Sequence, residues 1–469
     1  MRREREERAA GRSAEAALEA AAATSGRAVL ISGFTVMVAM AGMYFTGSST
    51  FSSFATGTII VVAVAMIGSI TVLPALLSKL GDRVDKARVP FLHRLRSSNG
   101  ESRVWGAILD RVLARPKISV AVATGLLLVL AFPAFSLKTG VPGTDTLPRD
   151  LPVMQTFDRI EAAFPGGPLP AVVAIQADDV TAPAVRTAIA DLRRDALATG
   201  EMKQPVQVDV SPDRRVARVL LPLAGDGSDA RSERALTTLR TDLIPSTLGR
   251  VGGVEASVSG QTAQSRDFND LMKGHAPIVF AFVLTMAFLL LLVTFRSLVI
   301  PIKAIVLNLL SVGAAYGVLV WVFQDGHGEQ LLGFESTGAI TSWLPLFLFV
   351  ILFGLSMDYH VFILSRIREA FDRGMRTEDA VAHGIKSTAG VVTSAAIVMV
   401  AVFAIFATLT AVEFKQMGVG LAVAVLLDAT IVRAVLLPAM MKLLGDWNWY
   451  LPRRLQRLPR VIREPQLET

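Results

Sequence analysis

The sequence predicts a polytopic α-helical membrane protein with about eight transmembrane helices and one extracytoplasmic α+β domain of ferredoxin-like arrangement. Three observations lead to this fold class. Hydrophobic residues make up 52% of the 469 residues and charged residues only 19%, whereas about 25% of an average soluble domain is charged. Eight apolar stretches are long enough to cross a bilayer. Residues 139–275, between the third and fourth stretch, instead alternate strand-like and helix-like patterns.

The eight stretches are identified by length, because a helix needs about 20 mostly apolar residues to cross the hydrocarbon core. They lie near residues 27–46, 55–78, 117–137, 276–295, 299–323, 343–365, 388–410 and 417–443. Small residues inside them, such as Gly68 and Ser311, favour helices that pack closely against one another. The chain is therefore divided into 1–79, a linker 80–116, a span 117–138, the domain 139–275, a five-helix bundle 276–443 and a basic tail 444–469.

The basic residues predict the orientation. Segments 1–25, 80–116, 296–303, 366–387 and 444–469 hold 25 Lys and Arg, whereas the alternate segments 47–54, 324–341 and 411–416 hold one, Lys415. Positively charged loops stay in the cytoplasm, so both termini are expected there, in a bacterial cytoplasmic membrane. The net charge of +7 is thereby explained without nucleic acid.

The segment 139–275 predicts a βαββαβ order. Val172 to Gln176 and Val254 to Val258 indicate strands, 181–198 and 230–243 indicate helices, and 206–210 with 216–221 indicates a hairpin. This order is the split βαβ, ferredoxin-like arrangement. The topology places the domain outside the cell.

Composition excludes several kinds of chemistry. The sequence holds no cysteine and only five scattered histidines, so disulfides, thiol nucleophiles and a metal site are not expected. No Walker A pattern occurs; an ion gradient is the expected energy source, with no cofactor. The residues before Asp358 lack the Gly-x-Gly-Asp setting of intramembrane aspartyl proteases, and no enzymatic activity is expected.

An internal repeat relates the two ends of the chain. Leu73-Pro-Ala75 recurs as Leu437-Pro-Ala439 at an offset of 364 residues, and Gly81-Asp82 recurs as Gly445-Asp446. Spans one and two therefore copy spans seven and eight, and spans three to six have no earlier counterpart. A two-repeat protein would carry about 250 further residues upstream of Met1.

The sixth stretch contains the strongest functional candidate. Asp358 lies within an otherwise apolar helix, and an acid at that depth by default marks an ion or proton path. Tyr359 supplies a hydroxyl that can bond an acid on a facing helix. Gly354 and Phe362, at i−4 and i+4, place a close-approach site and an aromatic ring on the Asp358 face. The alternative is a structural aspartate satisfied by neighbouring hydroxyls.

A second polar set lies in the seventh and eighth stretches. Asp428 and Arg433 are five residues apart, about 140° around an α-helix, so we expect each to meet another helix or the cytoplasmic surface rather than its mate. Thr393 and Ser394 are candidates for an inter-helix polar network, although hydroxyls in helices often bond their own backbone.

The motif Gly354-Leu-Ser-Met-Asp-Tyr359, continuing through Leu-Ser-Arg-Ile-Arg-Glu369, resembles the signature of the MMPL family ("mycobacterial membrane protein large") in the resistance–nodulation–division superfamily. Asp428-Ala-Thr-Ile-Val-Arg433 and Gly260-Gln-Thr-Ala263 are similar to further family patterns. The resemblance implies twelve spans, two porter-type domains and Asp-Tyr pairs on spans four and ten. Asp358 and Tyr359 match the tenth-span pair, and Phe362 matches an aromatic beside it.

The resemblance implies proton-driven export of lipidic or hydrophobic molecules, with membrane lipids and a lipid substrate as partners. Asp358 would carry the proton and Tyr359 would be its hydrogen-bond partner. The alternatives are a protein-export accessory of the SecDF type, a sterol-sensing-like membrane protein or an inactive fragment. The missing N-terminal half as a separate chain, or a second copy, is a further expected partner.

The repeat predicts that this chain alone does not transport. The partner Asp-Tyr pair maps a few residues upstream of Met1, and an uncovered Asp358 facing lipid would cost roughly 2.5–3.5 kcal/mol on insertion scales. An upstream open frame that encodes four spans and ends in Asp-Tyr would support this expectation. An in-frame stop immediately upstream, together with proton-coupled efflux by this chain in proteoliposomes, would contradict it.

Overall fold

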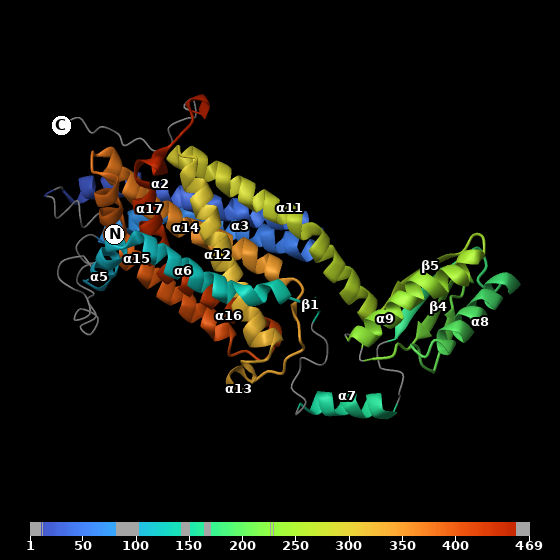
Figure 1. Ribbon diagram of the computed structural model, residues 1–469. Coiled ribbons are helices and arrows are strands. Elements are labelled where there is room, and N and C mark those ends of the chain that lie inside the picture. The colour runs from blue at the N-terminus through green and yellow to red at the C-terminus, as the bar shows by residue number, and fades with distance from the viewer. Residues whose placement is uncertain are drawn as a thin grey trace.

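The computed structural model describes residues 11, 13–80, 103–141, 151–163, 170–225, 227 and 229–455. Within these residues eight helical segments are long and apolar enough to cross a membrane, which agrees with the number predicted. They gather into a bundle, and a small α/β domain lies beyond one end of it, at the tip of one long helix (Figure 1).

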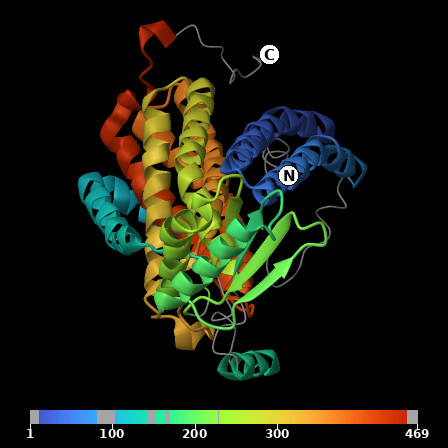
Figure 2. The ribbon, with the colours of Figure 1, turned by 90° about the vertical axis from the view of Figure 1, so that its right-hand side faces the viewer.

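The first part of the chain contributes three membrane-length segments and one short helix. Their bounds are α2 (Ala14–Ala41) with the 3₁₀ turn η1 (Gly42–Thr46), α3 (Ser49–Ile70) with α4 (Val72–Leu80), α5 (Arg103–Ala114), and α6 (Pro116–Ala131) with η4 (Phe132–Ser136). Figure 2 shows α2 and α3 (blue) as a pair at one side of the bundle. This pair contacts the remainder chiefly through α2, which packs along α14, and through Phe54 of α3, whose ring meets Phe347 of α14 edge to face.

The second part contributes the other five membrane segments and the short elements between them. Their bounds are α11 (Gln261–Phe295), α12 (Val299–Leu319) with η8 (Val320–Gln324), α13 (Glu329–Leu332), α14 (Leu344–Asp372), α15 (Thr377–Phe406), α16 (Val412–Leu427) with η9 (Asp428–Leu436) and α17 (Leu437–Leu444), η10 (Gly445–Trp449) and η11 (Arg453–Leu455).

Burial separates the helices of the bundle into central and peripheral ones. In its most apolar window α14 has 61% of its residues buried, whereas α15 has 17% and α3 none. α14 contacts α2, α11, α12, α15 and α16. A helix that is apolar all round and enclosed by five others is the natural place for a buried polar site.

Close helix packing in the bundle depends on glycine at one crossing in particular. A Cβ added to Gly317 of α12 would collide with the backbone carbonyl of Leu130 on α6. The two backbones therefore approach to a distance that only glycine permits.

The structure also displays the internal repeat. α15 and α16 begin at Thr377 and Val412, and shifted by 364 residues these starts fall within one residue of those of α2 and α3. The repeated prolines, Pro74 and Pro438, lie at the beginnings of α4 and α17. Gly81 and Asp82, the other repeated pair, lie outside the described residues.

The α/β domain has the predicted βαββαβ order. Its elements are β2 (Ala171–Gln176), α8 (Pro183–Ala198), β3 (Gln207–Val210), β4 (Val216–Leu221), α9 (Ala230–Thr238) continued by η6 (Leu239–Leu243), α10 (Ile244–Ser246) and η7 (Leu248–Arg250), and β5 (Glu255–Ser259). The sheet order is β3-β4-β2-β5 with every neighbouring pair antiparallel. This topology confirms the ferredoxin-like arrangement.

Two boundaries of the domain differ from those predicted. β1 (Thr139–Gly140) pairs in parallel with β6 (Ile340–Thr341) at the end of the bundle, so these residues belong with the membrane helices. The helix of the fourth span, α11, begins at Gln261, before the predicted apolar stretch that starts near 276. Its first turns, residues 261–275, are rich in polar residues. Between β1 and β2, α7 (Pro152–Ala163) lies apart from the sheet (Figure 1).

The junction between β5 and α11 is fixed by a close backbone contact at Gly260 and by the hydrogen bonds of Arg240. Gly260 has φ +112°, and a Cβ there would lie 2.8 Å from the Pro170 carbonyl oxygen. Arg240 donates to both carboxylate oxygens of Asp267, at 2.6 and 2.9 Å, and to the Val258 carbonyl at 3.1 Å. The domain is therefore held to α11 by its last strand and its second helix.

The predicted linker and tail are described in part. Residues 1–10 of the first predicted segment, 81–102 of the linker and 456–469 of the tail lie outside the described residues. In the described tail Trp449 stacks on Phe371, with the Arg368 guanidinium 4.8 Å from its ring centroid. Trp447 and Tyr450 are exposed, as expected for an interfacial anchor.

The Gly317 contact gives a first prediction. Gly317→Ala should lower the free energy of unfolding by about 1–3 kcal/mol, because the methyl group forces α12 and the α6 carbonyl apart. Gly125→Ala on α6, where nothing lies within 4 Å of the added Cβ, is the matched control and should leave stability unchanged or slightly raised. Thermal unfolding of both variants in detergent measures the difference; equal midpoints would contradict the packing argument.

Candidate functional site

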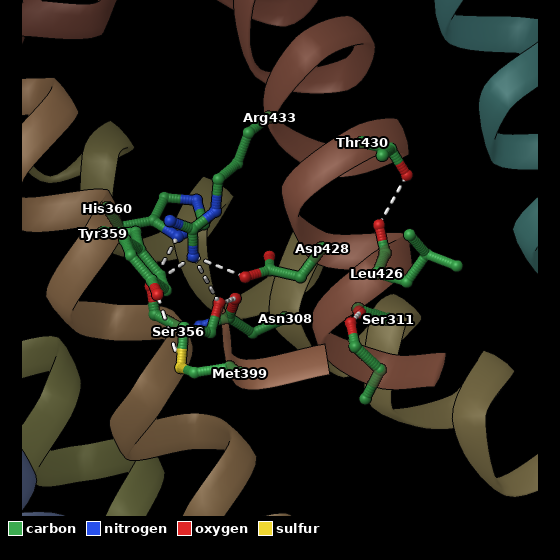
Figure 3. A network of polar contacts seen from close by, with 11 residues as sticks. Asn308, Ser311, Ser356, Tyr359, His360, Met399, Leu426, Asp428, Thr430 and Arg433 are labelled. Carbon is green, nitrogen blue, oxygen red and sulfur yellow. Dashed lines mark hydrogen bonds and ion pairs between the residues drawn. The ribbon is translucent and has the colours of Figure 1, made fainter. Parts of the chain in front are cut away.

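A cluster of polar side chains lies inside the bundle where α12, α14 and η9 meet (Figure 3). Its members are Asn308, Ser356, Tyr359, His360, Asp428 and Arg433. All but Tyr359 are buried. Polar groups enclosed at membrane depth are costly unless they bond to each other or to backbone carbonyls.

Arg433 is the centre of the cluster, with 1% of its surface exposed. Its Nη2 forms an ion pair with Asp428 and donates to the Ser356 carbonyl at 2.7 Å. Its guanidinium carbon lies 4.3 Å from the centroid of the Tyr359 ring. The charge is therefore neutralised by a carboxylate, bonded to the backbone of α14 and placed over a π face.

The ion pair corrects the prediction that Asp428 and Arg433 point apart. That prediction assumed an α-helix, but Asp428–Leu436 forms a π-helix. In a π-helix each backbone N–H bonds to the carbonyl five residues earlier, as the N–H of Leu437 does to Val432. Residues five apart, such as Asp428 and Arg433, therefore lie on nearly the same side of the helix. The expectation that each meets another helix holds for Arg433, which contacts α14.

A hydrogen-bond chain extends the cluster to α12. Ser356 Oγ donates to Asn308 Oδ1 at 2.5 Å. Asn308, Ser311, Ser356, Tyr359 and Asp428 line a cavity of about 20 Å³ together with apolar side chains. A cavity of that size with several polar partners has room for one water molecule. His360 Nδ1 lies 3.3 Å from the Ser356 carbonyl oxygen, which places the ring within the packed core.

Asp358 lies on the face of α14 that meets α2. The Ser32 hydroxyl of α2 and the Arg433 guanidinium are both near enough to interact with its carboxyl group. Gly354, one turn away, also faces α2: a Cβ there would make an ordinary van der Waals contact, 3.5 Å from the Cβ of Ala39. Asp358 Oδ1 is buried and has no hydrogen-bond partner among the described residues.

Tyr359 and Phe362 occupy neighbouring positions on α14. The Tyr359 hydroxyl donates to Met399 Sδ of α15 at 3.4 Å, rather than to an acid in the part of the chain that is described. Phe362 is half-buried and packs against the core of the bundle. Both therefore lie beside Asp358, as the sequence predicted. The hydroxyl of Tyr359, however, bonds to a thioether and not to the predicted acid.

The predicted network role of Thr393 and Ser394 is not realised in the structure. Thr393 Oγ1 donates to the Ala389 carbonyl at 2.8 Å and Ser394 Oγ to the Val391 carbonyl at 3.0 Å. Both hydroxyls satisfy their own helix, which is the usual outcome where no polar partner faces them.

Three members of the site escaped sequence reasoning. Asn308 could have been identified from the sequence, because an amide side chain within an apolar span is unusual. Ser32 and Ser356 could not, since serines in membrane helices commonly bond their own backbone. Among the described residues no group of three or more His, Cys, Asp or Glu is placed to hold a metal ion.

The architecture and the buried cluster define a class, a polytopic α-helical membrane protein that carries one ferredoxin-like α/β domain. SecDF from Thermus thermophilus, a translocon-associated membrane protein, superposes with a TM-score of 0.54 over 94% of this chain and 51% of that chain, at 16% identity. At that identity the likeness is one of fold.

The chain belongs to the MMPL family, whose model matches residues 1–119 and 145–463. It is 39% identical to the "Mycolic acid-containing lipids exporter MmpL11" of Mycolicibacterium smegmatis over 100% of this chain and 49% of that protein. It is 37% identical to the "Heme uptake protein MmpL11" of Mycobacterium tuberculosis over 98% of this chain and 47% of that protein. The chain thus spans about half the length of these relatives.

The buried ion pair gives the second prediction. Asp428→Asn should lower stability by about 3–5 kcal/mol and reduce the folded yield, because Arg433 would keep its charge without a counter-ion. The double variant Asp428→Asn/Arg433→Met should recover much of the loss, since both charges are removed.

The measurement is the monodisperse fraction after membrane extraction, with thermal unfolding of what remains. Asp372→Asn, which removes a half-exposed ion pair with Arg368 at the end of α14, is the control and should change stability by about 1 kcal/mol or less. A double variant less stable than Asp428→Asn alone would contradict the argument.

Proposed function

We propose that the protein is part of an exporter of lipidic or hydrophobic molecules that is driven by the proton-motive force, with Asp358 as the proton carrier. The single observation that carries the proposal is the carboxyl group of Asp358 at membrane depth, with one buried oxygen lacking a partner in the described structure. The printed name of the Mycolicibacterium smegmatis relative supports the substrate class.

The unpartnered oxygen supports a proton-carrying role by its chemistry. A carboxylate in the membrane interior needs compensation for its charge, and Asp358 has no ion-pair partner among the described residues, only the Ser32 hydroxyl and the more distant Arg433 guanidinium nearby. Asp428 also has one buried oxygen without a partner, but its other oxygen forms an ion pair with Arg433. Of the two acids, Asp358 is therefore the one whose charge a proton can remove at least cost.

The position of Asp358 supports coupling of the proton to movement. It lies between α2, which belongs to the first repeat, and α14, which belongs to the second. In transporters built from repeats, ion sites lie where the repeats meet, and transport is largely a rocking of one repeat against the other. Loss of the Asp358 charge would change the contact between α2 and α14.

Arg433 and Tyr359 are assigned positioning roles in this proposal. The guanidinium sets a positive field near Asp358, and its bond to the Ser356 carbonyl fixes the part of α14 that presents the acid. The Tyr359 ring beneath it keeps the guanidinium in place. The cavity beside Ser356 and Asp428 offers one water site next to this group.

The α/β domain is proposed to form part of the substrate path outside the membrane. Its attachment to α11 through Arg240 and Asp267 supports this role, because movement of the bundle would be transmitted along a continuous helix. Both chain termini are then on the cytoplasmic side, as the basic loops predict.

The third prediction tests the proton carrier at the chromosomal locus, so that the protein is made in its native form. Asp358→Asn should abolish appearance of the exported lipid at the cell surface, at normal protein abundance in the membrane. Tyr359→Phe should reduce the rate roughly tenfold, because the ring under Arg433 remains and only the hydroxyl is lost.

Thr393→Val is the control, because its hydroxyl bonds its own helix, and it should export at the rate of the unmodified protein. Surface lipid is quantified by mass spectrometry after a pulse of labelled precursor, with and without collapse of the pH gradient. Normal export by Asp358→Asn would end the proposal that this residue carries the proton.

A further inference from the structure

A groove on the α/β domain lies between α8 and the edge strand β3 and encloses about 450 Å³. Its apolar lining includes Ile189 and Leu197 of α8 and Val208 and Val210 of β3. Arg186, Arg193 and Arg194 line it as well, all from α8. α8 lies at the outer end of the domain, away from the membrane bundle (Figure 1). The groove is thus separate from the buried cluster.

The register of the sheet explains why the floor of the groove, formed by Val208 and Val210 of β3, is apolar and yet exposed. Val208 pairs with Val219 and Val210 with Ala217, and both β4 residues are fully buried. Paired residues project from the same face of a sheet, so the two β3 valines lie on the helix-covered face. They are nevertheless 42% and 46% exposed, because the helices cover the inner strands and stop short of β3.

The three arginines that line the groove differ in whether an acidic side chain neutralises their charge. Arg194 forms ion pairs with Asp191 at 2.7 Å and Asp195 at 3.0 Å. Arg186 and Arg193 are exposed and have no acidic partner in the part of the chain that is described. They are seven residues apart on α8, two turns along one face, so their guanidinium groups flank the same stretch of groove.

From this combination we infer that the groove binds an anionic single-chain amphiphile, whose acyl chain lies along the two valines of β3 and whose acidic head group pairs with Arg186 and Arg193. The volume lies within the range of ordinary small-molecule sites. Guanidinium groups bind carboxylate and phosphate oxygens in paired hydrogen bonds. Two free cations beside an open apolar strip match a ligand that is acidic at one end and apolar along its length.

This inference goes beyond the proposed export function. It concerns binding by the α/β domain and depends on neither Asp358 nor a proton gradient. The readout below is therefore binding alone, and its failure would leave the export proposal untouched.

The experiment uses the full chain in phosphatidylcholine nanodiscs. The probe is oleoyl lysophosphatidylglycerol that carries a photoreactive diazirine near the end of its chain, and the adducts are mapped by peptide mass spectrometry. Adducts should concentrate in the peptides that contain residues 186–197 and 206–210. The same lipid with a phosphocholine head, which has no net charge, should bind roughly tenfold more weakly.

Two variants test the two halves of the ligand. Arg186→Gln/Arg193→Gln should weaken binding of the anionic probe roughly tenfold and remove its preference over the phosphocholine lipid. Val208→Asn/Val210→Asn keeps both cations but makes the floor polar, and should reduce adduct formation with either lipid. Arg231→Gln/Arg250→Gln removes two exposed arginines of the same domain that are not part of the groove, and should bind as the unmodified chain does.

Three results would overturn the inference. The first is equal affinity for the two head groups. The second is unchanged binding by Arg186→Gln/Arg193→Gln. The third is protection of the groove peptides by a concentration-dependent dimer without any lipid adduct, which would make a second copy of the chain the occupant. Circular dichroism of each variant confirms that the domain remains folded.

Discussion

The buried guanidinium of Arg433 is the constraint on which the centre of the bundle depends. A full charge inside a membrane protein must be compensated where it lies, and Arg433 obtains its compensation from Asp428, the Ser356 carbonyl and the Tyr359 ring. The ion pair with Asp428 requires the π-helical turn. The contacts with the Ser356 carbonyl and the Tyr359 ring bind η9 to α14. Because the guanidinium and the Ser356 carbonyl fix α14 against η9, the opposite face of α14, which carries Gly354 and Asp358, is directed at α2.

The Asp428–Arg433 charge pair has no counterpart at the repeat-related positions of this chain. At the repeat offset of 364 residues, Asp428 and Arg433 correspond to Val64 and Ser69, and α3 is an α-helix throughout that stretch. None of the most apolar window of α3 is buried. The same helical frame is therefore used twice: once as a peripheral apolar helix and once as a buried helix whose geometry is altered by a charge pair. The π-helix follows from the pair, because a regular helix would separate the two charges.

The sequence was sufficient for every feature that depends on composition or on a regular period. Eight spans follow from the length of apolar stretches, the βαββαβ domain follows from alternation, and Asp358 stands out because acids are rare in such helices. The Asp428–Arg433 pair was missed because a period of 3.6 residues was assumed where the chain adopts another. The start of α11 was missed because its first turns are polar and carry no membrane signal. The groove between α8 and β3 depends on strand register and helix coverage, which neither composition nor periodicity contains.

The arrangement separates the charges of the bundle into a fixed set and a variable one. Asp428 and Arg433 form an ion pair and are enclosed within the bundle. Asp358 lies one helix face away, within the electrostatic reach of Arg433 and near the Ser32 hydroxyl of α2. In its charged form it draws on the same guanidinium that Asp428 already neutralises. In its protonated form it leaves that pair undisturbed and can donate a hydrogen bond across the α2 contact. Under the proposed function, a single proton at Asp358 would change the interaction between the two repeats without breaking the cluster that holds the second repeat together, which is the property required of a group that couples protons to motion.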